Sequence, residues 1–288
     1  MNAKIATYYK NAKSAFTFVF DDGCYYDSTM EAYKVLKEVY EKTGVKIKIT
    51  SAQTVNFISP TLKNMWDELF KEGYFDLAGH SVSHCLGYNK NTPYSELEKD
   101  ATETKKALEE MYGIPVLTFV TPGGGDDYEG LEVLRKHYIA NRNGHDRIND
   151  TYNMDLYDIG TFTARFAYDT EAPYIENIEG TIEKGGWSVQ INHWLSQKTE
   201  DTHHAQRLST FMPECMYIAK KAIENELWVC SLNDMAKYIY IRDNSTPVIE
   251  NGKLRLESKL DKAVFDIPVS VILEDRVVDI ALGQEIQL

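Results

Sequence analysis

The sequence has little of what marks disulfide-rich, membrane-spanning or nucleic-acid-binding proteins. It has four cysteines and no C-x-x-C spacing, so neither a zinc ribbon nor a disulfide framework is indicated. No apolar run approaches the roughly 18 residues that a bilayer span requires. Positive charge is scarce, because 31 Lys and Arg residues stand against 44 Asp and Glu residues and leave a net charge of −13. We therefore expect no nucleic-acid partner and no membrane insertion.

The remaining composition is that of an ordinary globular protein. Hydrophobic residues make up 43% and charged residues 26% of the 288 positions, which excludes disordered and fibrous classes. This length corresponds to roughly two domains or to one large α/β barrel. Met1–Lys4 does not open an apolar signal sequence. A chain trimmed after its signal peptide would begin in the same way, so the sequence leaves the compartment open.

Apolar runs of strand length alternate with segments of helical period along most of the chain. The predicted strands are Ala15–Phe20, Val45–Thr50, Phe75–Ala78, Leu117–Thr121, Tyr138–Asn141, Trp187–Asn192 and Leu227–Cys230. The predicted helices run from Asp27 or Ser28 to about Lys42 and over Thr61–Lys71, Pro93–Tyr112, Leu131–His137 and Leu208–Asn225. Sustained alternation favours an α/β fold with a parallel sheet, either open or closed into a barrel.

The pattern changes after about Ile241. Arg242–Pro247 is rich in turn formers, and Lys253–Leu288 consists mostly of short stretches in which apolar and polar residues alternate. Such alternation is typical of antiparallel strands. We therefore predict a main α/β domain, residues 1–241, and a small β-rich C-terminal appendage, residues 242–288.

Candidate chemistry is found where the predicted strands end, because ligands bind at the carboxyl ends of parallel strands. The first strand is followed by Asp21, Asp22 and Gly23. Two adjacent carboxylates after an apolar strand are costly to bury unless a cation offsets their repulsion. An exposed turn is the alternative interpretation, since Asp-Asp-Gly is common turn chemistry.

A second polar cluster follows the predicted strand Phe75–Ala78. His80 and His84 share one face of a helical turn, a spacing that suits a divalent metal ion, although such pairs also arise by chance. One Asp and two His leave a coordination position open, as in catalytic rather than structural zinc sites. The spare carboxylate is then available to accept a proton from water.

These residues give the chain a resemblance to a known family. Phe18–Gly23, the H-x-x-x-H of His80 and His84, and Ile191–His193 resemble successive motifs of the polysaccharide deacetylases, carbohydrate esterase family 4. The order and spacing fit over about residues 14–240. The resemblance implies a distorted (β/α)7 barrel, to which the C-terminal β appendage would be added.

The same resemblance implies roles for individual residues. Asp21 would be the general base and His193 the general acid. Asp22, His80 and His84 would hold one divalent metal ion, for which we expect zinc, with cobalt or nickel as alternatives.

A third motif resembles the family's over Phe119–Gly125. It implies that Pro122, Gly123 and Gly124 face the substrate and that a backbone N–H there, that of Gly123, donates to the developing oxyanion. Glycine allows a backbone to approach a substrate closely, which fits this use. Trp194, directly after His193, is a candidate for stacking on a sugar ring, and packing in the core is the alternative.

The chain departs from the family pattern at Val120, where many members carry an arginine that pairs with the catalytic base. Some members with a Pro-Gly-Gly version of the motif carry this arginine at the end of the next strand instead. Arg142 matches that place, and Arg165 is the second candidate. An ordinary solvated residue is the alternative interpretation of Arg142.

The remaining histidines carry no prediction of chemistry. His137 and His145 have no partner at ligand spacing, and His203 and His204 lie in a polar stretch that we interpret as a solvated loop.

We therefore predict a metal-dependent hydrolase that removes acetyl groups from an N-acetylated polysaccharide or oligosaccharide. The alternatives are a polysaccharide O-acetyl esterase, for example on acetylxylan, a hydrolase of a small amide, and a non-catalytic carbohydrate-binding protein. The expected partner is an acetylated carbohydrate, and the sequence does not indicate an oligomeric state. The resemblance favours an extracytoplasmic location if a signal peptide has been removed, and a cytoplasmic one otherwise.

Overall fold

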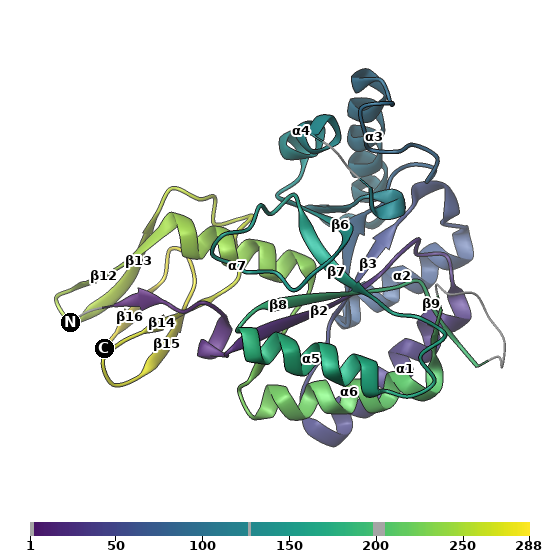
Figure 1. Ribbon diagram of the computed structural model, residues 1–288. Coiled ribbons are helices and arrows are strands. Elements are labelled where there is room, and N and C mark those ends of the chain that lie inside the picture. Colours follow the sequence, from purple (N-terminus) through teal and green to yellow (C-terminus); the bar gives the residue numbers. More distant parts are fainter. Residues whose placement is uncertain (1–2, 126–127, 198–204) are drawn as a thin grey trace.

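Seven parallel strands close into a barrel in the computed structural model, which describes residues 3–125, 128–197 and 205–288 (Figure 1). They are β2 (Ser14–Phe20), β3 (Ile49–Gln53), β4 (Phe75–Gly79), β5 (Thr118–Val120), β6 (Ala140–Asp146), β7 (Ile159–Thr163) and β8 (Trp187–Asn192). They follow one another in chain order, and β2 also pairs with β8, which closes the barrel. The predicted α/β barrel is thereby confirmed.

Helices cover the outside of the barrel and its amino-terminal end. They are α1 (Tyr26–Thr43), α2 (Pro60–Glu72), α3 (Tyr94–Tyr112), α4 (Tyr128–His137), α5 (Ala172–Lys184), α6 (Leu208–Ile223) and α7 (Leu232–Asn244). Leu232, Met235 and Ala236 of α7 share one apolar cluster with barrel residues such as Ala15 and Val189, so this helix closes the barrel core. Within the described ranges, no helix combines the length and hydrophobicity needed to cross a bilayer.

The first barrel strand has two partners on one of its edges. Its start, Ser14–Phe16, pairs with β11 (Leu227–Val229), whereas its end, Phe18–Phe20, pairs with β3. The strand predicted over Val45–Thr50 therefore begins later, at Ile49, because β11 occupies the edge that the earlier residues would need.

Alternation along the strands decides which side chains face the barrel interior. In β2, Phe16 and Phe18 join the outer cluster with α1 and α6, and the ring of Phe18 lies 5.5 Å from that of Phe211. Val19 joins the inner cluster. Because successive side chains alternate between the two faces, Asp21 continues the inward-facing series at the mouth of the barrel.

The C-terminal strands form two small antiparallel sheets, shown in yellow-green at the left of Figure 1. One contains β12 (Ser245–Glu250), β13 (Lys253–Ser258) and β16 (Glu285–Gln287), and the other contains β1 (Lys4–Ile5), β14 (Val269–Ile272) and β15 (Val277–Ile280). Their apolar side chains cluster with Tyr238 and Ile241 of α7. The division after residue 241 lies within α7 and stays a prediction.

A buried polar network joins β8 to α6 just below the mouth of the barrel. Gln190 and Asn192 of β8 donate hydrogen bonds to the side-chain oxygen of Gln206, which lies in β10 (Ala205–Arg207). The side-chain NH₂ group of Gln206 in turn donates to Glu214 Oε2 at 2.6 Å. Glu214 is completely buried. Burial raises the pKa of Glu214 to about 8, although hydrogen bonds with Gln206 and Gln190 oppose the shift. Glu214 is therefore largely protonated at neutral pH.

This protonation makes stability depend on pH. The pKa of Glu214 is higher in the folded state than in the unfolded state, so protonated Glu214 contributes to the free energy of unfolding. This contribution is fully present below the unfolded pKa, about 4.5, and is lost as the pH rises through about 8. Glu214→Gln mimics the neutral acid, so between pH 5 and pH 9 the wild type should lose more stability than the variant, by on the order of 3–4 kcal/mol. Urea unfolding at several pH values measures this difference. Glu110→Gln, on the surface of α3, is the control, and parallel curves for wild type and Glu214→Gln would contradict a neutral Glu214.

Candidate functional site

The residues predicted to carry chemistry converge at the carboxyl ends of the barrel strands. Asp21 and Asp22 directly follow β2, His80 follows β4, Arg142 lies in β6 and His193 follows β8. These strands are distant in sequence but adjacent or opposed around the barrel, so its closure brings the five side chains together.

A cluster of three potential metal ligands lies on one side of the mouth. His80 Nε2 and His84 Nε2 lie 3.7 and 3.8 Å from Asp22 Oδ1. All three ligand atoms lie within 4.8 Å of one another. Two ligand atoms that each lie about 2.0–2.2 Å from one ion can be at most about 4 Å apart. The distances from Asp22 Oδ1 to the two Nε2 atoms are below this limit, so Asp22 can share an ion with each histidine. The cluster therefore needs only a small contraction to hold one ion.

His80 is prepared to act as a ligand through Nε2. Its Nδ1 lies 2.7 Å from the carbonyl oxygen of Val120, which can only accept, so the proton is on Nδ1 and the lone pair is on Nε2. Burial lowers the pKa of His80 to about 4 and keeps the ring neutral. Among the described residues, Nε2 is buried and has no hydrogen-bond partner. An orphaned acceptor beside a carboxylate and a second histidine fits a divalent ion.

The backbone around the ligands adopts conformations that are uncommon for residues other than glycine. The φ angles of Asp22, Ser81 and His84 are 73°, 69° and 60°. Such angles cost of order 1–3 kcal/mol each and concentrate at functional sites. Gly23 has a φ of 73° as well, and a Cβ there would lie 2.7 Å from the Gln53 side chain. The sharp turn after β2 thus aims Asp22 at the two histidines.

Asp21 lies beside this cluster and is held by a buried arginine. Arg142 Nη2 lies 2.6 Å from both carboxylate oxygens of Asp21, and the two residues are only 1% and 5% exposed. Burial raises the pKa of Asp21, but the charge of Arg142 and its hydrogen bonds outweigh this effect and hold the pKa below its usual value. Asp21 is therefore ionised and able to accept a proton.

The position of Arg142 explains how Val120 is tolerated. Val120 of β5 and Arg142 of β6 are direct partners in the parallel pairing of the two strands. Adjacent strands are about 4.8 Å apart, a shift that the long side chain of an arginine can span. Arg142 thus approaches Asp21 from the strand next to Val120, at the same level of the barrel. Arg165, the second candidate, is exposed.

His193 and Trp194 directly follow Asn192, whose backbone carbonyl accepts a hydrogen bond from the N–H of Asp21. His193 Nε2 lies 3.9 Å from Asp21 Oδ2, and the side chain is 21% exposed. The ring of Trp194, at the start of β9 (Trp194–Ser196), packs 4.9 Å from that of Tyr25, and both are half-buried. The hydroxyl of Tyr25 in turn donates to Asp22 Oδ2 at 3.2 Å. Tyr25 stands beside the Asp pair in the sequence, but no local pattern predicts that its hydroxyl contacts Asp22.

The glycine-rich loop after β5 forms a single turn, η3 (Pro122–Gly124), at the rim of the mouth. Gly123 and Gly124 have φ angles of 69° and 68°, which glycine adopts without steric cost. Gly123 is exposed, and a Cβ on it would meet no atom within 4 Å. Its backbone is therefore accessible to a ligand in the mouth.

The other histidines are not part of this cluster. His137 Nε2 contacts Glu98 at 2.7 Å, and His145 Nδ1 lies 3.2 Å from Asp158, both outside the mouth. His203 and His204 lie outside the described residues.

Comparison with known proteins supports the family resemblance. A family model described as polysaccharide deacetylase matches residues 9–141, which include Asp21, Asp22, His80 and His84. The resemblance to the polysaccharide deacetylases is thereby confirmed. No curated protein matches the sequence.

Several solved structures share the fold. A proposed polysaccharide deacetylase from Mycobacterium smegmatis has 13% identity and a TM-score of 0.54, with 84% of this chain and 96% of that chain covered. The CE4 domain of a multidomain xylanase from the hindgut metagenome of Trinervitermes trinervoides has 13% identity and a TM-score of 0.50, with 77% and 89% covered. A CE4 pseudoenzyme from Bacillus anthracis has 12% identity and a TM-score of 0.52, with 79% and 66% covered. Since a pseudoenzyme is among them, the residues of the site, rather than the fold, bear on activity.

The ligand cluster predicts metal binding that a single substitution abolishes. His80→Ala removes one of three ligands and should weaken zinc or cobalt binding by more than the roughly 10–100-fold that loss of an outer-shell partner costs. Equilibrium dialysis followed by elemental analysis measures the affinity and stoichiometry, with about one ion expected for the wild type. His137→Ala is the matched control, and equal metal retention in both variants would place the site elsewhere.

Proposed function

We propose that this protein is a metal-dependent hydrolase that removes acetyl groups from an N-acetylated polysaccharide or oligosaccharide. The observation that carries the proposal is the contact set of Asp21. The carboxylate of Asp21 is held by the buried Arg142 and lies 3.9 Å from His193 Nε2. In the chain, Asp21 directly precedes Asp22, one of the three potential metal ligands. A base, an acid and a three-ligand cluster thus share one barrel mouth.

In this proposal each residue has a separate task. When bound by Asp22, His80 and His84, a divalent ion supplies Lewis-acid polarisation and lowers the pKa of water. Asp21, kept ionised by Arg142, accepts the proton of the attacking water.

The leaving group and the developing charge are assigned to two further groups, which follow β8 and β5. His193 donates a proton to the departing amine, and the backbone N–H of Gly123 donates a hydrogen bond to the developing oxyanion. Trp194 and Tyr25, whose rings pack together at the edge of the mouth, offer an aromatic surface to a sugar ring.

Acetate release tests the proposal. Chitooligosaccharides, acetylated xylan and an aryl acetate are incubated with the metal-loaded protein, with and without a chelator. Release from the N-acetylated substrate that the chelator suppresses is expected. Release only from xylan would assign an O-acetyl esterase, and no release from any of the three would favour a small-amide hydrolase or a carbohydrate-binding protein.

Asp21→Asn and His193→Ala should each lower kcat/KM by about 10²–10⁴, because a positioned proton-transfer group contributes that much. Metal content should stay close to the wild type in both variants. The thermal midpoint should stay close to the wild type in His193→Ala and fall in Asp21→Asn, because the buried charge of Arg142 then lacks its partner. His137→Ala, which changes a histidine outside the mouth, should leave kcat/KM unchanged. A variant that keeps more than about a tenth of the wild-type kcat/KM would lose its assigned role.

Arg142→Met should change how activity depends on pH. Without the guanidinium, burial raises the pKa of Asp21 with less opposition, so the ionised base is lost at higher pH. The lower pKa of the kcat/KM profile should therefore rise and the rate at neutral pH should fall, with unchanged metal content. Arg165→Met is the control, and an unaltered profile in Arg142→Met would remove Arg142 from the site.

A further inference from the structure

Strand β6 contains a bulge directly after Arg142. Arg142 pairs with Ile159 of β7 and Asp146 pairs with Thr161, so residues 143–145 stand opposite Gly160 alone. A bulge bends a strand and redirects the adjacent side chains. In this barrel it lies next to the arginine that crosses the mouth to Asp21.

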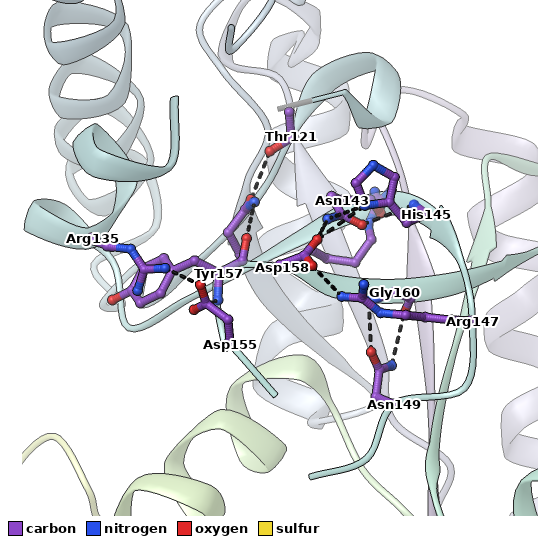
Figure 2. A network of polar contacts seen from close by, with 12 residues as sticks. Thr121, Arg135, Asn143, His145, Arg147, Asn149, Asp155, Tyr157, Asp158 and Gly160 are labelled. Carbon is purple, nitrogen blue, oxygen red and sulfur yellow. Dashed lines mark hydrogen bonds and ion pairs between the residues drawn. The ribbon is translucent and has the colours of Figure 1, made fainter. Parts of the chain in front are cut away.

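The bulge is fastened by Asp158, which precedes β7 (Figure 2). Asn143 is buried, and its side-chain NH₂ group donates to Asp158 Oδ1. The Oδ1 atom of Asn143 accepts a hydrogen bond from the backbone N–H of His145 at 3.0 Å. His145 Nδ1 lies 3.2 Å from the same Asp158 oxygen, and Arg147 pairs with the other oxygen at 2.8 Å. One carboxylate thus contacts two residues of the bulge and Arg147, which directly follows β6.

The fastened segment contacts both Arg142 and the glycine-rich loop. The backbone carbonyl of Asn143 accepts a hydrogen bond from Arg142 Nη1 at 3.2 Å. Gly144 packs against Gly124 so closely that a Cβ on Gly124 would lie 2.8 Å from the Gly144 Cα atom. The bulge therefore supports the guanidinium from one side and the turn that presents Gly123 from the other.

We propose that Asp158 is a positioning residue, which fixes the bulge through Asn143 and thereby aims Arg142 at Asp21. The proposal rests on the function proposed above, in which Arg142 keeps the base ionised. Asp158 itself lies outside the mouth and touches none of the groups assigned to the reaction.

A double-variant experiment tests whether Asp158 acts through Arg142. Asp158→Ala should lower kcat by about 10–100-fold, the scale of a small misplacement of a catalytic group, with little change in KM and in metal content. In an Arg142→Met background the same substitution should cost less than about threefold, because residues that act through one another are not additive. Additive losses would overturn the proposal.

Two further variants separate positioning from general damage to the fold. Asp158→Asn keeps an oxygen that accepts from Asn143 and should recover most of the activity. Asp155→Ala is the matched control, since Asp155 lies on the same segment and pairs with Arg135 in Figure 2, away from the bulge. It should behave as the wild type, and a loss equal to that of Asp158→Ala would contradict the proposal.

A readout independent of activity keeps the two proposals distinguishable. The ¹⁵N NMR signal of the Arg142 Nε–H, identified by its disappearance in Arg142→Met, should shift in Asp158→Ala and stay in place in Asp155→Ala. If the wild type releases no acetate from any substrate, the proposed function fails while this signal still tests the positioning. An unmoved signal in Asp158→Ala would overturn the positioning role even in an active enzyme.

Discussion

The buried ion pair between Asp21 and Arg142 is the interaction on which the site depends. Strands β2 and β6 are not neighbours in the barrel, so the pair crosses its mouth. Each charge is almost completely removed from water, and removing one partner of such a pair typically costs about 3–5 kcal/mol because the other is left uncompensated. Because two opposite walls are tied together by charge, Asp21 is both ionised and fixed in place.

The alternation of strand residues makes this crossing possible. Ala78 lies two residues before His80 and Ala140 two residues before Arg142, so each alanine lies directly below a site residue on the inner face. Their small side chains leave room above the core for an imidazole and a guanidinium. The outward-facing positions of these and the neighbouring strands carry larger side chains, such as Leu77 beside Ala78 and Phe119 beside Val120, which pack against the surrounding helices.

The sequence predicted those parts of the molecule that depend on short-range patterns of residues. Trp187–Asn192 is a strand with the predicted bounds, since one apolar run coincides with one element. Arg142 was found because Val120 left a position without its expected cation. The late start of β3 and the pairing of β1 with β14 depend on partners far along the chain, which no local pattern reveals. Asp158 was missed for the same reason, because an aspartate in a polar loop gives no sign that it fastens a bulge.

The pairing of β2 with β8 has a consequence for how the protein folds. Asp21 is made early and His193 late during synthesis, and the two meet only when the last barrel strand docks against the first. Contacts between residues so far apart require closure of a long loop, whose entropic cost must be met before the contacts form. Until that closure, Asp21 has neither its histidine neighbour nor an enclosed mouth. The contact between Asp21 and His193 therefore forms only once the barrel is closed, and until then a nascent chain lacks part of the site.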